Sequence, residues 1–234
     1  MHNKNNLIAL FDIDWTLING LNRMHSESFR YIFKHVFRLE NINVYDIRPH
    51  GMTDLQIIFE ILRIHNLSAL FTKKRVNMSV RLMGNYYVEN SYKEQVTLMP
   101  GVIDLLNTLK KRGYLMGILS GNIERIGKQK LVDALISEYF SFGAFGDMSV
   151  SRSELVDFAE INMQKNGIKA QKNQFVIIGD SVRDIECAKN SKLPSIGVAT
   201  GSYSNKEIQL AGANLAVNTL KEVNSVMRFF SHGR

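Results

Sequence analysis

The segment LIALFDIDWTLING, residues 7–20, places two aspartates directly after five consecutive apolar residues. Asp12 and Asp14 are two positions apart, and on an extended chain such side chains point the same way. Neighbouring carboxylates raise each other's pKa unless a positive group lies between them. Because aspartates after a strand also cap helices or form turns, the rest of the chain has to show whether this pair has a chemical role.

Strands buried on both faces are predicted at four apolar segments, which are LIALF (7–11), YLMGIL (114–119), QFVIIG (174–179) and the weaker PSIGVA (194–199). Helical patterns lie between them, at residues 102–113, 151–167 and 204–213. This alternation predicts an α/β fold with a doubly wound parallel sheet, a Rossmann-like core.

Helix ends are marked by small groups of residues. Ser151 with Glu154, and Ser204 with Glu207, have the spacing of capping boxes. Gly113 follows a helical pattern and is a candidate C-cap.

Residues 19–95 differ from the rest, because they have helical periodicity without a convincing strand. Three apolar stripes carry this pattern: Phe29, Ile32, Phe33, Val36 and Phe37; Leu55, Ile58, Phe59 and Leu62; and Val76, Val80, Met83 and Tyr87. We therefore predict an all-helical cap domain at 19–95, inserted into an α/β core made of residues 1–18 and 96–234.

Composition limits the possible functions. The 234 residues carry a net charge of +7, but the basic runs TKKR (72–75), KKR (110–112) and KQK (128–130) are scattered and are interpreted as solvated helix faces. We therefore do not expect nucleic-acid binding. The one cysteine, Cys187, excludes an internal disulfide and is interpreted as a small buried residue. No apolar run reaches the roughly 20 residues needed to span a membrane. The segment MHNKNN lacks the basic-then-apolar order of a signal peptide. We therefore expect a cytoplasmic protein without a membrane partner.

Polar residues collect where the predicted strands end. Asp12 and Asp14 follow the first strand, SGN (120–122) the second and GDSVRD (179–184) the third. Parallel strands bring such ends to one edge of the sheet, where ligands bind. Asp12, Asp14 and Asp180 would form a carboxylate cluster suited to Mg²⁺. The positive charge of this ion would allow Asp12 and Asp14 to be ionised at the same time. Ser120, Gly121 and Arg152 offer donors and charge for a phosphate group.

These motifs resemble the haloacid dehalogenase-like superfamily, specifically its phosphatases with a helical cap after the first motif. DIDWT (12–16) is similar to the family's D-x-D-x-T, LSGN (119–122) to its Ser/Thr motif and GDSVRD to its G-D-x-x-x-D motif. The similarity covers essentially the whole chain. Two departures are Trp15, where a small residue is more usual, and Arg152, where most relatives have lysine. Arginine keeps the charge but adds a planar fork.

The resemblance implies a mechanism. Asp12 would be the nucleophile that forms an aspartyl-phosphate, and Asp14 the general acid and base. Mg²⁺ would be held by Asp12, the Asp14 main-chain carbonyl and Asp180, with Asp184 in support. The predicted phosphate-binding residues are Thr16, Ser120, Gly121, Asn122 and Arg152. Because dehalogenases of the superfamily lack the second aspartate, its presence favours phosphoryl transfer.

Substrate choice is expected to depend on the helical insertion. The segment IRPHGMTDLQII (47–58) resembles the cap loop of phosphoglycolate phosphatase-like members. Arg48, His50 and Thr53 are candidates to contact the substrate, although Thr53 could serve only as a helix N-cap and Arg48 could be solvated. A histidine-based hydrolase is not expected, since none of the six histidines lies beside a core motif.

The leading hypothesis is a Mg²⁺-dependent phosphatase of a small phosphorylated metabolite, with phosphoglycolate as the first candidate and a monomer or homodimer as the expected state. A sugar-phosphate phosphatase, a 5′-nucleotidase or a phosphomutase would share the same core residues. A phosphonate hydrolase would need a desolvated cap lysine, and nothing marks Lys73 or Lys74 as one. A basic binding protein on the same fold is the alternative outside enzymes.

Overall fold

A parallel sheet of six strands forms the centre of the computed structural model, which describes residues 7–232. Within these residues the strand order is β3-β2-β1-β4-β5-β6, the order of a doubly wound dinucleotide-binding sheet. The strands are β1 (Ile8–Phe11), β2 (Met116–Leu119), β3 (Phe142–Ala144), β4 (Phe175–Gly179), β5 (Ser195–Val198) and β6 (Leu215–Val217). The predicted fold class is confirmed, and each of the four predicted strands is present within two residues of its expected ends.

The edge strands β3 and β6 were not predicted. Each has only three residues, too few to show a strand pattern in the sequence. Each strand pairs with its neighbour along one side, so backbone hydrogen bonding to an already formed sheet accounts for these strands.

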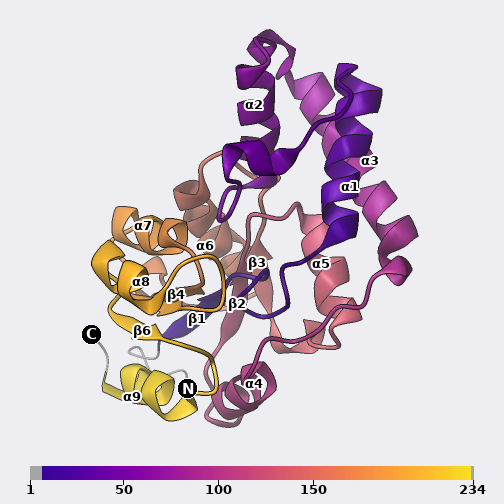
Figure 1. Cartoon of the computed structure of the whole chain (residues 1–234). Coiled ribbons are helices and arrows are strands. Elements are labelled where there is room, and N and C mark those ends of the chain that lie inside the picture. Colours follow the sequence, from indigo (N-terminus) through magenta and orange to yellow (C-terminus); the bar gives the residue numbers. More distant parts are fainter. Residues whose placement is uncertain (1–6, 233–234) are drawn as a thin grey trace.

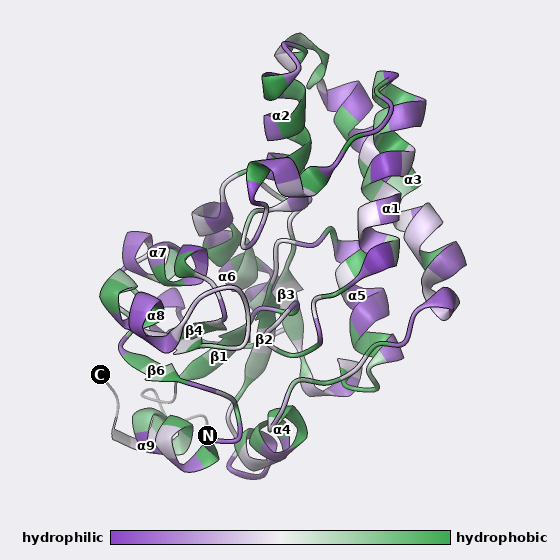
Figure 2. Ribbon diagram, in the orientation of Figure 1, coloured by the Kyte–Doolittle hydropathy of each residue, from purple (hydrophilic) through white to green (hydrophobic). Residues whose placement is uncertain are grey.

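Helices cover both faces of the sheet (Figure 1). In β1, Ala9 and Phe11 pack with one cluster of helices, and Ile8 and Leu10 with the other, as the two-residue repeat of a strand requires. The helices of the α/β core are α4 (Val102–Lys111), α5 (Glu124–Asp133), α6 (Leu155–Lys165), α7 (Val182–Asn190), α8 (Asn205–Ala211) and α9 (Val223–His232). Figure 2 shows apolar residues along the strands and on the helix faces toward the sheet.

Two of the three predicted helix ends are confirmed. Gly113 follows α4 with φ of 77°, and Ser204 forms the capping box of α8 with Glu207. The capping box predicted at Ser151 was wrong. A 3-10 turn at Arg152–Glu154 precedes α6, and Glu154 instead accepts a hydrogen bond from Ser149 Oγ.

The helical insertion, residues 19–95, stands above the carboxyl ends of the strands (Figure 1). It contains α1 (Arg23–Ile32), a π-helical turn (Phe33–Phe37), α2 (Asp54–Ile64) and α3 (Lys73–Asn90). All residues of the predicted apolar stripes except Phe59 pack in one cluster, which also includes Ile123 and Ile126 of the α/β core. The chain leaves and re-enters the α/β core side by side, where Ile18 forms a bridge to Leu98. That the insertion is a separate domain stays a prediction.

Short 3-10 turns complete the described secondary structure, at Val44–Ile47, Ser68–Leu70, Ser91–Lys93, Ser137–Tyr139, Arg152–Glu154 and Lys172–Gln174. Between residues 7 and 232, none of the helices combines the length and apolar character needed to cross a bilayer.

Candidate active site

Three strand ends bring the predicted site residues to one edge of the sheet. Asp12 follows β1, Ser120 follows β2 and Asp180 follows β4. Since β1 lies between β2 and β4 and all three are parallel, their carboxyl ends lie side by side. The strand order reverses at this point, which is where open α/β sheets bind ligands.

Asp12, Asp180 and Asp184 form a buried acidic cluster, in which one carboxylate oxygen of each lies within 4.8 Å of the others. Burial is the main cause that raises the pKa of Asp12 to about 7, against the opposing effect of Arg152. Burial, together with Asp184 and Asp12, also raises the pKa of Asp180 well above its usual range. Converging carboxylates that lack enough positive charge fit a hard divalent cation such as Mg²⁺.

Arg152 is the cation in contact with this cluster. Its Nη2 donates to Asp12 Oδ1 at 2.8 Å and to Asp184 Oδ1 at 2.5 Å. The side chain is buried, and its Nε has no hydrogen-bond partner. A buried donor without a partner is costly, so this guanidinium has unused capacity for an anion such as a phosphate oxygen.

The predicted carboxylate cluster of Asp12, Asp14 and Asp180 was wrong for Asp14, whose carboxylate does not belong to the acidic cluster. Both of its oxygens lie 2.8 Å from Lys130 Nζ, and Asn122 Nδ2 donates to Oδ2 at 2.8 Å. Burial acts to raise the pKa of Asp14, but the charge of Lys130 and the hydrogen bonds from Lys130 and Asn122 outweigh it, and the pKa is lowered. Asp14 is therefore held as a carboxylate, facing a buried ammonium and not the neighbouring acids.

Lys130 corrects the interpretation of KQK (128–130) as a solvated helix face, because its side chain is 0% exposed. The signal for this was present in the sequence. Position 130 continues the buried stripe of α5, which includes Ile126, Gly127 and Leu131. A lysine in phase with an apolar helix stripe therefore indicates a buried charge with a partner.

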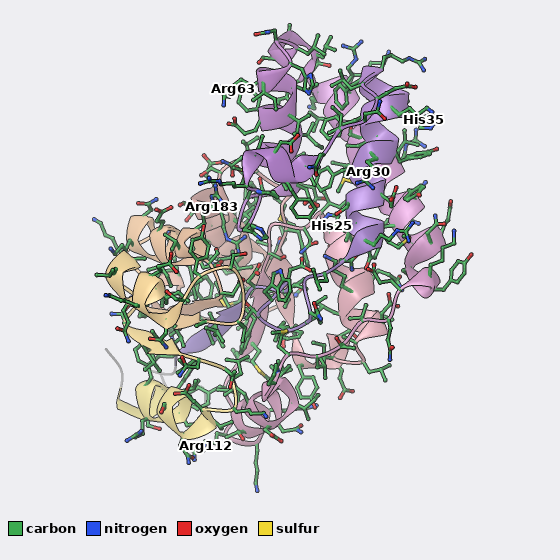
Figure 3. All side chains as sticks on the ribbon, viewed as in Figure 1. His25, Arg30, His35, Arg63, Arg112 and Arg183 are labelled. Carbon is green, nitrogen blue, oxygen red and sulfur yellow. The ribbon has the colours of Figure 1, made fainter. Side chains whose placement is uncertain are left out.

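His25 lies beside none of the core motifs in the sequence, but the fold brings it to the site. Its Nδ1 is 3.2 Å from Lys130 Nζ and its Nε2 is 3.2 Å from Asp54 Oδ2. Because an ammonium can only donate, Nδ1 accepts and the proton lies on Nε2, which donates to Asp54. Figure 3 shows His25 at the end of α1 that faces the α/β core. Nothing local in the sequence indicated this contact.

The predicted phosphate-binding residues lie in two places. Gly121 and Asn122 line the cavity between the strand ends and the helical insertion, which has a volume of about 220 Å³. Ser120 and Thr16 are completely buried and are not among its lining residues. Thr16 Oγ1 donates to Asp180 Oδ1 at 3.4 Å, so Thr16 contacts the acidic cluster and not the cavity.

Arg48 and Thr53 do not line the cavity, which corrects their predicted contact with the substrate. Arg48 is exposed, and its carbonyl accepts from Arg183 Nη1 at 3.2 Å. Thr53 is buried and caps α2, with its hydroxyl also donating to Val150 O. The alternatives considered for both residues, a solvated arginine and a helix cap, describe them better. His50 does line the cavity.

The loop before α2 is docked on the α/β core. The Asp54 amide donates to Gly121 O at 2.7 Å, and Asp54 Oδ2 accepts from the Ile123 amide at 2.8 Å. Arg183 also donates to His50 O, and Figure 3 shows Arg183 on the side of the core that faces this loop. A Cβ on Gly121 would lie 2.1 Å from Met52 O, so only glycine permits this close approach.

Trp15 also lines the cavity. It adopts φ of 62° and its carbonyl accepts from Thr200 Oγ1 at 2.5 Å. Its indole occupies the space that a Cβ on Gly20 would need, at 2.3 Å. The bulky residue between Asp14 and Thr16 therefore contacts the first residues of the helical insertion.

Without a metal ion, stability is expected to fall as the pH rises from about 4 to about 7, because Asp12 keeps its proton in the folded state but loses it on unfolding. Mg²⁺ should offset this loss. The increase in Tm on replacing EDTA by Mg²⁺ should be larger at about pH 8 than at about pH 5. An equal increase at both pH values would argue against metal binding by this cluster.

A sequence model described as haloacid dehalogenase-like hydrolase matches residues 9–198. The phosphoglycolate phosphatase of Escherichia coli K12 is 28% identical over 152 residues, which is 64% of this chain and 59% of that protein. The match thus spans less than two thirds of this relative's length.

Two solved structures have the same fold. A crystal structure described as a predicted phosphoglycolate phosphatase from Haemophilus somnus 129PT aligns with a TM-score of 0.67 and 20% identity, over 97% of this chain and 100% of that one. A β-phosphoglucomutase from Clostridium difficile aligns with a TM-score of 0.73 and 19% identity, over 97% and 98%. At these identities the similarity concerns the fold alone.

Proposed function

Because this chain belongs to the haloacid dehalogenase-like hydrolase family, we propose that it is a Mg²⁺-dependent phosphatase of a small phosphate monoester. The observation that supports this most strongly is the buried acidic cluster of Asp12, Asp180 and Asp184 in contact with Arg152. Asp14, a fourth carboxylate with a different environment, lines the cavity beside this cluster.

Mg²⁺ would be held by Asp12 and Asp180, with the Asp14 main-chain carbonyl as a further ligand and Asp184 in support. When bound, the ion would neutralise charge on the phosphoryl group and on the acids. Thr16 would hold Asp180 in place through its hydroxyl.

Asp12 would act as the nucleophile. One of its carboxylate oxygens attacks phosphorus, so that a new P–O bond forms while the P–O bond to the leaving alcohol breaks. The resulting aspartyl-phosphate is then hydrolysed by water, which restores the free carboxylate. Arg152, which donates to Asp12 Oδ1 at 2.8 Å and lines the cavity, would hold this side chain and stabilise the phosphoryl oxygens with its guanidinium charge.

Asp14 would act as the general acid and base. It would donate a proton to the leaving alkoxide and later accept a proton from the attacking water. Lys130 lowers its pKa in the free protein, which suits the second of these roles. An anionic substrate beside Asp14 favours its protonated form, which suits the first. Gly121 and Asn122 line the cavity and would bind the phosphate, while the fully buried Ser120 would act through Asn122, whose Nδ2 donates to it.

The test is phosphate release from a panel of monoesters, measured with Mg²⁺ and with EDTA. The panel contains phosphoglycolate, pentose and hexose phosphates, nucleotides and aryl phosphates. Continuous, metal-dependent release is expected from at least one of them. A phosphomutase would instead return the phosphoryl group to a sugar, so a burst of release that stops, together with isomerised sugar phosphate, would contradict a phosphatase.

A further inference from the structure

The wall of the cavity that the helical insertion contributes is mostly uncharged. Phe29, Val44 and Ile57 are buried and present apolar surface to it. Two hydroxyl groups also line this wall, Ser26 Oγ and Tyr45 Oη, which lie 3.3 Å apart. This wall therefore offers apolar contact and neutral hydrogen-bonding groups to whatever is attached to the phosphate.

The charges around the cavity are unbalanced. Among its lining residues in the described part of the chain, Arg152 is the only lysine or arginine, against four aspartates, Asp12, Asp14, Asp54 and Asp180. Arg152 is engaged by the acidic cluster and would serve the phosphoryl group. Lys130 lies nearby, but its side chain is 0% exposed and it donates to Asp14, Asn122 and His25.

The two histidines of this wall do not supply the missing positive charge. His25 accepts from Lys130 at Nδ1 and donates to Asp54 at Nε2, the hydrogen-bonding pattern of a neutral imidazole. Burial and the nearby Arg183 lower the pKa of His50, which favours its neutral form. A second anionic group in this cavity would have no cation to pair with and would lie among aspartates.

We propose that the leaving group of the substrate is a small uncharged alcohol with an apolar flank, and that the cavity selects against monoesters with a second anionic group such as a carboxylate. This inference rests on the proposed phosphatase function. A carboxylate placed in this cavity would lose part of its hydration without gaining a cation as partner, which disfavours its binding. The volume of about 220 Å³ also limits size, since a cavity of about 150 Å³ holds one benzene ring.

Matched esters test this selection directly. The values of kcat/KM for phenyl phosphate and 2-hydroxyethyl phosphate, both with neutral leaving groups, are compared with that for phosphoglycolate, which adds a carboxylate at similar size. We expect the neutral esters to exceed phosphoglycolate by about tenfold or more. Equal or faster turnover of phosphoglycolate would overturn the proposal.

A charge introduced at the cavity should change the preference. Leu21 lines the cavity but is 73% exposed, so Leu21→Lys is expected to fold and to raise the relative rate on phosphoglycolate about threefold to fivefold. Leu21→Met has a similar shape without the charge and should leave the ratio unchanged. Leu210→Lys adds the same charge at another exposed leucine, on α8, and should also leave it unchanged. A ratio that shifts equally in all three variants would contradict the proposal.

Binding separates this proposal from the proposed phosphatase function. The Asp12→Asn variant is titrated calorimetrically with phenyl phosphate and with phosphoglycolate in the presence of Mg²⁺, so that no turnover is needed. Tighter binding of phenyl phosphate supports the selection even if the wild-type protein releases no phosphate. Tighter binding of phosphoglycolate, or no binding of either ester, overturns it.

Discussion

Asp12→Asn is expected to reduce phosphate release by about three orders of magnitude or more, because the amide oxygen is a poor nucleophile. Asp12 sits at the end of β1, in contact with Arg152 and in the acidic cluster, so no other carboxylate is placed to take over its role. Initial rates on the best ester of the panel measure the effect. Asp104→Asn, at an exposed position in the first turn of α4, should keep full activity.

The same substitution should not destabilise the fold. Asp12 is a buried carboxylate whose pKa is raised to about 7. In EDTA at about pH 8 its negative charge therefore destabilises the folded state, and asparagine removes that charge. We expect an unchanged or higher Tm for Asp12→Asn under these conditions. Loss of activity combined with a Tm several degrees lower would mean that Asp12 has a structural role, and the rate loss would then not establish it as the nucleophile.

Lys130→Met is the second substitution with a large expected effect, here on stability. Removing this buried ammonium leaves Asp14 without its ion-pair partner, and His25 Nδ1 and Asn122 Oδ1 without a donor. We expect the free energy of unfolding to fall by about 3 kcal/mol, less than for a fully buried pair because the side chain of Asp14 is 26% exposed. Denaturant unfolding of wild type and variant measures the difference.

The control lies on the same helix. Lys128 is 65% exposed and pairs with Glu124, so Lys128→Met should change the unfolding free energy by about 0.5 kcal/mol or less. The double variant Asp14→Asn/Lys130→Met should recover part of the loss, since both charges are then removed. Purely additive effects of the two substitutions would contradict an energetic coupling between these residues.

Activity supplies a second readout for Lys130. If this lysine holds Asp14 ionised, its removal should raise the pKa of Asp14 and shift the acidic limb of the pH profile of kcat/KM to higher pH. A merely structural lysine would lower the amount of folded protein but leave the profile of the folded fraction in place. The profile of Lys130→Met, measured below its unfolding temperature, distinguishes the two.

Much of the sheet and of the acidic cluster was predictable because both depend on local patterns. Strands buried on both faces appear as short apolar runs, and in a parallel sheet their ends must meet at one edge. This reasoning anticipated that residues after β1, β2 and β4 would converge, as Asp12, Ser120 and Asp180 do. It missed β3 and β6, whose three residues each carry no pattern of their own.

Residues of the helical insertion were predicted less well. Arg48 and Thr53 were chosen because polar residues next to a glycine suggest a binding loop, but one is solvated and the other caps α2. The residues that do line the cavity, such as Phe29 and Ile57, belong to apolar stripes that look like ordinary helix core. Whether such a residue faces a cavity or a neighbouring helix depends on how the insertion docks, which no local pattern encodes.

Periodicity and the ends of strands are enough to predict the doubly wound sheet, the helical nature of residues 19–95 and the convergence of Asp12 and Asp180. Long-range packing, by contrast, pairs Asp14 with Lys130, 116 residues away in the chain, and adds His25 and Asp54 to this network. A buried charge is stable only beside its partner. That partner is selected by the packing of α1, α2 and α5 around the strand ends, and not by its distance along the chain.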